Sequence, residues 1–104
     1  MTYIMIVKKN DLVTSLNCTA HSPDSKLCAV LSLALWGTIE TLQQHTQVKF
    51  DIVKAEPKTA TVILDNFSNW TTEGLIVMTE FLVQLQLIKE SFGEDSFTLD
   101  VIEE

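Results

Sequence analysis

The chain has 104 residues, of which 46% are hydrophobic and 20% charged, a composition that fits one globular domain and excludes a disordered or repetitive chain. Fourteen acidic against seven basic residues give a net charge of -7, the reverse of the balance found in proteins that bind nucleic acid directly. This acidity instead favours basic partners.

A β-hairpin is expected at the start of the chain. Residues 2–8 are rich in β-branched and aromatic side chains, which is typical of a strand. Residues 9–11, Lys-Asn-Asp, favour a turn, and residues 12–19 then return as a second strand.

A long helix is predicted next, from about residue 26 to about residue 45. Either Asp24 or Ser25 can accept hydrogen bonds from the first free backbone amides and so cap it. Ala34 and Gly37 on its surface would allow close packing against a sheet or a partner. Apolar residues at three- and four-residue steps predict one broad buried face, formed by Leu27, Val30, Leu31, Leu35, Ile39 and Leu42.

A second hairpin follows, since its two strands leave room only for a tight turn. Residues 48–55 alternate, which places Val48, Phe50 and Ile52 on one face and Lys49 and Asp51 on the other. A turn is predicted at residues 56–58 and a strand at 59–65, with Ala60, Val62 and Leu64 on one face. Residues 66–70 are expected to be a loop.

The second helix is predicted to begin after Thr71 or Thr72 and to end at Gly93. Its apolar residues cover so much of its circumference that we expect cover on two sides, by the sheet and by a second subunit. The residues expected on the face toward the sheet are Leu75, Met78, Phe81, Leu82, Leu85, Ile88 and Phe92. The residues that widen the apolar surface beyond that face are Ile76, Val77, Val83 and Leu87. Phe97, Leu99 and Val101 predict a closing strand.

The resulting order is ββαββαβ, which predicts an α+β fold. We expect a mainly antiparallel five-stranded sheet, with two helices on one face, in a single domain over residues 1–104. The face of the sheet that the helices leave uncovered is a candidate dimer or substrate surface.

His21 and Cys28 make the most specific chemical proposal in the chain. If Ser25 is the N-cap, Cys28 is the third helical residue, where the positive end of the helix dipole favours a thiolate and free amides could bind an oxyanion. A short loop could bring His21 beside it as general base and then general acid. Asp24 is a possible orienting group for the imidazole, and Ser32 lies on the same helical face as Cys28, one turn along.

Two alternatives stay open for these residues. A free cysteine is often a small buried core residue, so Cys28 could be purely structural. Cys18, His21 and Cys28 could instead hold zinc, although the chain has no Cys-x-x-Cys pair and no obvious fourth ligand. Cys18 is expected to point inward, and His45 to stabilise the end of the first helix rather than to react.

The same segments resemble the ribosomal-processing cysteine protease (Prp) family. The family signature is Gly-His-Ala, a loop, and then a helix that opens with Cys-Ala-x-x-Ser. Ala20-His21-Ser22 stands for the first part here, and Cys28-Ala29-Val30-Leu31-Ser32 for the second. The length and the ββαββαβ order also fit, so the resemblance extends over essentially the whole domain.

The resemblance implies a thiol protease, usually a homodimer, that removes an N-terminal extension from a ribosomal large-subunit protein. Carried over by position, Cys28 is the nucleophile, His21 its base and Ser32 a serine of the site, with Asp24 and Ser25 close to the substrate. No cofactor and no metal are implied. The alternative is a non-catalytic dimeric acidic module that binds a basic ribosomal protein or peptide.

The sequence also predicts a cytoplasmic location without membrane contact. The apolar residues 3–7 have no basic region before them and are followed by two lysines, which is wrong for a signal peptide. Glu40 and Glu80 interrupt the apolar helical stretches, so we expect no membrane span. Two cysteines without an export signal favour reduced thiols.

Overall fold

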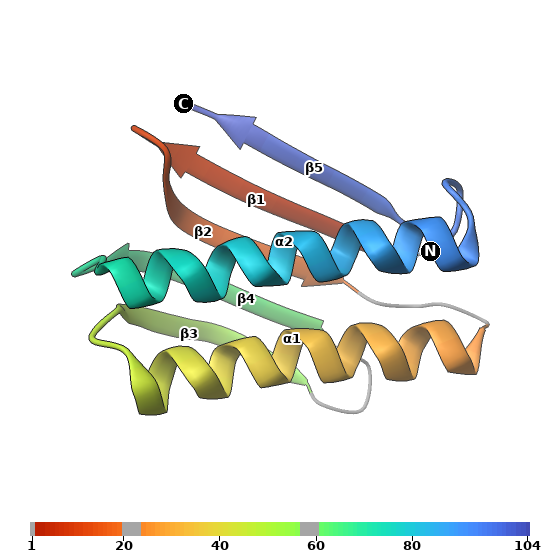
Figure 1. The fold of residues 1–104 in the computed structure, drawn as a ribbon, viewed down its shortest axis with the longest axis horizontal. Coiled ribbons are helices and arrows are strands. Elements are labelled where there is room, and N and C mark those ends of the chain that lie inside the picture. The colour runs from red at the N-terminus through yellow and green to blue at the C-terminus, as the bar shows by residue number, and fades with distance from the viewer. Residues whose placement is uncertain (1, 20–23, 57–60) are drawn as a thin grey trace.

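The computed structural model describes residues 2–19, 24–56 and 61–104. Strands and helices follow one another in the predicted order ββαββαβ, which confirms the α+β class (Figure 1). Their bounds are β1 Tyr3–Lys9, β2 Leu12–Thr19, α1 Ser25–His45, β3 Lys49–Glu56, β4 Thr61–Ser68, α2 Thr72–Phe92 and β5 Thr98–Glu103.

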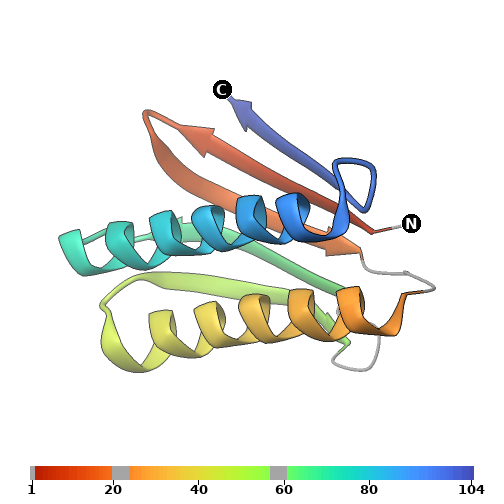
Figure 2. The same ribbon diagram turned by 45° about the vertical axis from the view of Figure 1, so that its right-hand side comes forward.

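The five strands form one sheet in the order β3-β4-β2-β1-β5. Three neighbouring pairs are antiparallel, as predicted, and only β1 and β5 run parallel. Both helices lie antiparallel to each other on the same face of the sheet, so the opposite face is uncovered (Figures 1 and 2). The parallel pair follows from α2, which carries the chain back across the sheet before β5 begins.

The hairpin between β1 and β2 has a two-residue turn made by Asn10 and Asp11. Both residues have positive φ, 54° and 63°. Two successive positive φ angles are typical of the type I′ turn, whose twist matches that of the strands it joins. The predicted first hairpin is therefore confirmed, with the turn residues that its geometry favours.

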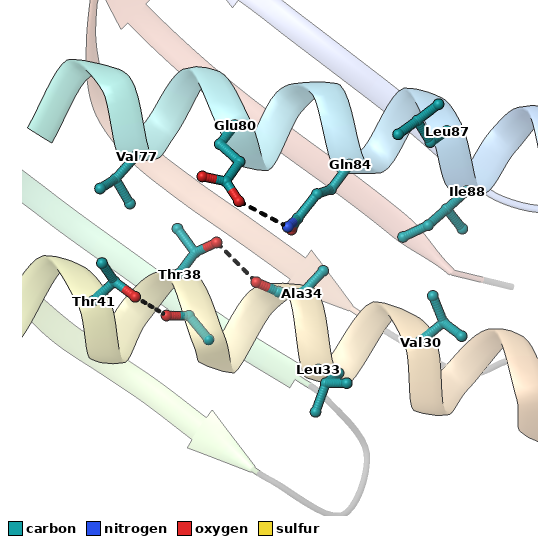
Figure 3. A pocket seen from close by; sticks show the side chains of 11 residues that line it. Val30, Leu33, Ala34, Thr38, Thr41, Val77, Glu80, Gln84, Leu87 and Ile88 are labelled. Carbon is teal, nitrogen blue, oxygen red and sulfur yellow. Dashed lines mark hydrogen bonds between the residues drawn. The ribbon is translucent and has the colours of Figure 1, made fainter.

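The core lies between the sheet and the two helices. Five of the six predicted residues of α1 are buried: Leu27, Leu31, Leu35, Ile39 and Leu42. The placement of Val30 in that face is wrong, because Val30 is turned toward the groove beside α2 and is 39% exposed (Figure 3). Leu75 of α2 is likewise exposed rather than buried. Met78, Phe81, Leu85 and Ile88 form the buried face of that helix.

The second hairpin departs from the predicted alternation. Ile52, expected to face inward, is 47% exposed although it pairs with the buried Leu64, because β3 is the edge strand of the sheet. The register of β3 against β4 also shifts between Lys49 and Asp51 and again between Ile52 and Lys54. Asn66 has a positive φ of 55° within β4, which then continues to Ser68. The predicted loop at 66–70 is therefore wrong in its first half.

Two residues of β4 lie in the core. Val62 and Leu64 are buried as predicted. Glu56 ends β3 and is not the start of the turn. The rest of the predicted turn, together with the start of the predicted strand and Ala60, lies outside the described residues.

The start of α2 packs very closely against the sheet. Thr71 is its N-cap and accepts a hydrogen bond from the amide of Gly74 at 3.2 Å. A Cβ atom on Gly74 would collide with Cγ2 of Val48 and would lie 3.3 Å from Cε3 of Trp70. Glycine is therefore needed at this position because of the close approach. The helix ends at Gly93, as predicted, with φ at 105° and its amide bonded to the carbonyl of Lys89 at 2.8 Å.

Among the described helices, only α1 is long and apolar enough to cross a membrane by length and composition. A core helix of a globular domain meets the same criterion, and one face of α1 is buried against the sheet.

Candidate active site at the start of α1

Asp24 organises the first turn of α1. It is the N-cap residue, with extended backbone angles of φ -85° and ψ 106°. Its Oδ1 atom accepts hydrogen bonds from the amides of Lys26 at 2.9 Å and Leu27 at 3.2 Å. Aspartate suits this place because its carboxylate satisfies amides that have no helical partner and complements the helix dipole.

Cys28 lies one position further into the helix than predicted. With Asp24 rather than Ser25 as the cap, Ser25 is the first helical residue and Cys28 the fourth. The amide of Cys28 donates to the carbonyl of Asp24 at 3.0 Å, the first hydrogen bond of the α-helical ladder. The amides of Lys26, Leu27 and Cys28 are therefore not free to bind an oxyanion, because Asp24 accepts a hydrogen bond from each of them.

The thiol of Cys28 is free and only partly buried, so it differs from an ordinary core cysteine. Ser32 is also half-buried and follows four residues later, which places it on the same flank of α1 one turn along. This flank is not the one that faces α2, since the residues pointing toward α2 are Val30, Ala34 and Thr38 (Figure 3). The structure thus brings Cys28 and Ser32 together, with Asp24 at the end of the same helix.

Trp36 continues this flank, and the sequence analysis did not single it out. It follows Ser32 by one further turn and is half-buried. Its indole Nε1 is buried without a hydrogen-bond partner, one of two such side-chain atoms in the described residues. The four-residue spacing from Cys28 through Ser32 to Trp36 is the sequence signal that could have identified it.

The predicted partner of Cys28, His21, lies outside the described residues. The pairing of His21 with Cys28, and the proposed contact of Asp24 with the imidazole, therefore remain predictions. His45, the other histidine, ends α1 at the far end from Cys28. At a rise of 1.5 Å per residue the two are separated by about 26 Å along the helix axis.

Cys18 has an environment opposite to that of Cys28. It lies on β2, paired with Ile4 and Val62, and is 1% exposed. Burial raises the pKa of the Cys18 thiol from 9.0 to about 11, and the nearby charge of Cys28 adds to the increase. Cys18 is therefore a protonated core residue, which confirms the expectation that it points inward.

A metal site finds no support in the part of the chain that the structure describes. No group of three or more His, Cys, Asp or Glu side chains could hold an ion there. The candidate set of Cys18, His21 and Cys28 includes a residue outside that part. The raised pKa of Cys18 nevertheless opposes its use as a thiolate ligand.

Comparison with known proteins gives a fold likeness only. No protein-family model matches the sequence, and no curated protein matches it either.

Several solved structures share the fold over essentially the whole chain. The ribosomal processing protease Prp from Staphylococcus aureus, in complex with a covalently linked product peptide, has a TM-score of 0.82 at 22% identity, covering 97% of this chain and 99% of that one. The same protease with a substrate peptide gives a TM-score of 0.80 at 19% identity, with the same coverage. The protein SMU.848 from Streptococcus mutans gives 0.81 at 12% identity, covering 100% of this chain and 99% of the other.

Proposed function

We propose that this chain is a cysteine peptidase of the Prp family that removes the N-terminal extension of a ribosomal large-subunit protein. The observation that carries the proposal is the position of Cys28, a partly exposed thiol that opens a Cys-Ala-x-x-Ser segment in the first turn of α1. The fold likeness to the S. aureus protease over nearly the full length of both chains supports it.

In the proposed reaction, Cys28 is the nucleophile and His21 the general base. His21 takes the thiol proton while Sγ of Cys28 attacks the scissile carbonyl carbon. Collapse of the tetrahedral intermediate breaks the C–N bond, and His21 returns the proton to the leaving amine. Water then hydrolyses the thioester, with His21 accepting its proton, and the free thiol is restored.

Asp24 sets a condition on this mechanism. Its carboxylate occupies the amides of Lys26 and Leu27, which otherwise would be oxyanion donors. An oxyanion at this helix end has to displace the carboxylate of Asp24 from these two amides or use other donors. Asp24 therefore acts in the proposal as the residue that fixes the first turn, and thereby the position of Cys28.

The choice of substrate rests on the resemblance, and the charge of the chain agrees with it. The chain carries a net charge of -7, and Glu90, Glu94 and Asp95 are exposed around the end of α2. In Figure 1 that end of α2 lies beside the start of α1. Negative charge at this end of the helix pair attracts a basic peptide, such as the terminus of a ribosomal protein. A homodimeric state and a cytoplasmic location belong to the same proposal.

Cleavage of a synthetic or recombinant extended N-terminus, followed by mass spectrometry, tests the proposal. We expect a single cut by the wild type and none by Cys28→Ala. The matched control is Cys18→Ala, which removes the other thiol and should leave the cut in place. His21→Ala should abolish cleavage as well.

Cleavage that survives in Cys28→Ala would refute the assignment of the nucleophile. Binding of the peptide without cleavage by the wild type would instead support the alternative, a non-catalytic acidic module. Cleavage by the wild type decides between the two, because a peptidase without its nucleophile and a binding module would both retain affinity for the peptide in Cys28→Ala.

A further inference from the structure

The two edges of the sheet differ in how well they are protected against pairing with a further strand. β3 forms one edge, where two register shifts interrupt its pairing with β4, and Lys54 and Glu56 form an ion pair of 3.5 Å. Irregular pairing and lysine side chains are common means of keeping an edge strand single. β5 forms the other edge, contains no lysine or proline, and pairs with β1 without any shift in register. The edge at β5 is therefore regular and lacks that protection.

The backbone of β5 offers hydrogen-bonding groups along this edge. The amide of Thr98 donates to the carbonyl of Thr2 at 3.0 Å, and the amide of Glu104 donates to the carbonyl of Lys8 at 2.8 Å. Bonding to one neighbour alternates along a strand, so every second residue between Thr98 and Glu104 points its N–H and C=O groups away from β1. These residues are Leu99, Val101 and Glu103. Because β5 is the last strand of the described sheet, each can donate to and accept from an added strand.

Two aliphatic side chains of β5 are exposed because no strand lies beyond it. Val101 is 48% exposed although its register partner Ile6 is fully buried, and Ile102 is 42% exposed. Successive residues of a strand point to opposite faces of the sheet, so Val101 and Ile102 lie on different faces. A strand added beside β5 would therefore cover one aliphatic side chain on each face.

The charge along this edge selects the kind of strand that can be added. Residues 98–104 contain Asp100, Glu103 and Glu104 and no basic residue. Among the described residues Lys8 is the register partner of Glu103, yet no ion pair joins their side chains. Opposite charges on neighbouring strands are stabilising, and like charges are destabilising. The edge therefore favours a strand with lysine or arginine side chains and disfavours a second copy of β5, which would bring the same carboxylates.

We propose that the edge of β5 binds a basic, extended segment of another polypeptide, which adds to the sheet as a further strand. Strand addition of this kind takes its affinity from main-chain hydrogen bonds and its specificity from alternate side chains. Basic side chains of the segment lie beside Asp100 and Glu104 on one face, and apolar side chains lie beside Val101 on the other.

This site is separate from the candidate active site. β5 lies along one border of the molecule, and α1, which carries Cys28, lies along the opposite border (Figures 1 and 2). The inference therefore goes beyond the proposed peptidase function and does not depend on it.

A titration of the isotope-labelled full chain, followed by the amide signals in nuclear magnetic resonance, tests this site. The probe is a capped peptide of alternating lysine and valine, about eight residues long. We expect the largest changes at residues 98–104 and none along α1. Val101→Pro removes a donor that points away from β1 and should weaken binding at least ~10-fold, about the effect of one hydrogen bond. Val101→Thr is the matched control, because it keeps the amide and the branched shape and should bind as the wild type does.

Two modified peptides test the same site without any change to the chain. N-methylation of every residue of the probe keeps its charge but removes its backbone donors, and should also weaken binding at least ~10-fold. A peptide of alternating glutamate and valine should leave the signals of β5 unchanged. Circular dichroism shows whether Val101→Pro is folded.

Three results would overturn strand addition at β5. The first is the absence of changes at residues 98–104 with the lysine peptide at about 2 mM. The second is a set of changes centred on another element. The third is binding of the N-methylated or the glutamate peptide as tight as that of the probe. Because the titration measures binding and not cleavage, a chain that binds the probe but cleaves nothing refutes the proposed function and not this inference.

Discussion

Substitution by alanine should lower the stability of the domain at Gly74 but not at Gly37. Both are helical glycines, and alanine normally stabilises such positions by about 1 kcal/mol. At Gly74 the added Cβ collides with Cγ2 of Val48, whose branched side chain has little rotamer freedom, and comes within 3.3 Å of Trp70. Overpacking costs about 1–3 kcal/mol, and a collision with a stiff side chain belongs to the upper part of that range. After the gain in helix propensity of about 1 kcal/mol is subtracted, we expect Gly74→Ala to lower the free energy of unfolding by about 1–2 kcal/mol.

For a domain of this size each kcal/mol corresponds to about 4–8 °C in Tm. Gly74→Ala should therefore melt roughly 5–15 °C below the wild type. Gly37→Ala, which meets nothing within 4 Å, should melt at or above it. Calorimetry at low protein concentration, with the monomeric mass verified, compares the chains without a contribution from the proposed dimer. If Gly74→Ala is as stable as Gly37→Ala, the close approach of α2 to Val48 is wrong.

Substitutions at three other positions test the cap of α1, the buried thiol and the end of α2. Asp24→Ala removes the cap of α1 and should lower the free energy of unfolding by about 1 kcal/mol in a denaturant titration. Asp24→Asn keeps an accepting oxygen but loses the charge, so iodoacetamide should alkylate Cys28 roughly two- to fivefold faster than in the wild type. Equal alkylation rates in Asp24→Asn and the wild type would contradict this. Burial raises the pKa of Cys18 from 9.0 to about 11, so the folded chain retains a proton that the unfolded chain releases. Stability should therefore fall by roughly 2 kcal/mol between pH 9 and pH 11. Cys18→Ala should flatten that slope, and an unchanged slope would place its origin elsewhere. Lys89→Met removes two hydrogen bonds, 2.8 and 2.6 Å long, to the carbonyls of Glu94 and Phe97, and a cation–π contact with the Phe97 ring. The rate of amide hydrogen exchange in the segment after α2 should therefore rise. The surface variant Glu90→Gln should leave that rate unchanged.

The element order was predictable because it depends on local periodicity. Alternation and three- to four-residue spacing identify strands and helices without knowledge of what they contact. The faces of the helices were harder to assign. Val30 and Leu75 belong to helices that are apolar on more than one side, so spacing alone could not tell the sheet side from the outer side.

A positive φ angle explains one error in the second hairpin, the predicted loop from residue 66. Asn66 at φ 55° lies where the register of β4 against β3 shifts, so a pattern that assumes strict alternation fails beyond it. The cap of α1 was ambiguous for a different reason. Aspartate and serine are equally good N-caps, and only the observed bonds to Asp24 decide between Asp24 and Ser25.

The nucleophile's side of the candidate site was predictable from local pattern, whereas its pairing with a base was not. A cysteine that follows cap residues and opens an apolar helix is visible in sequence, and the structure places Cys28 and Ser32 on one flank of α1. The reach from Cys28 to His21 depends on a loop whose path no local pattern specifies. That pairing therefore awaits the cleavage experiment.

The parallel pairing of β1 with β5 has a consequence for synthesis of the chain. The two strands are joined through Tyr3 and Thr98, and the Tyr3 hydroxyl also donates to Asp100 at 2.7 Å. On the ribosome, β1 can pair with β2 early, but its other edge stays open until residues 98–103 have emerged. An open edge recruits other strands, so this nascent chain is most prone to aggregation just before its final strand is added.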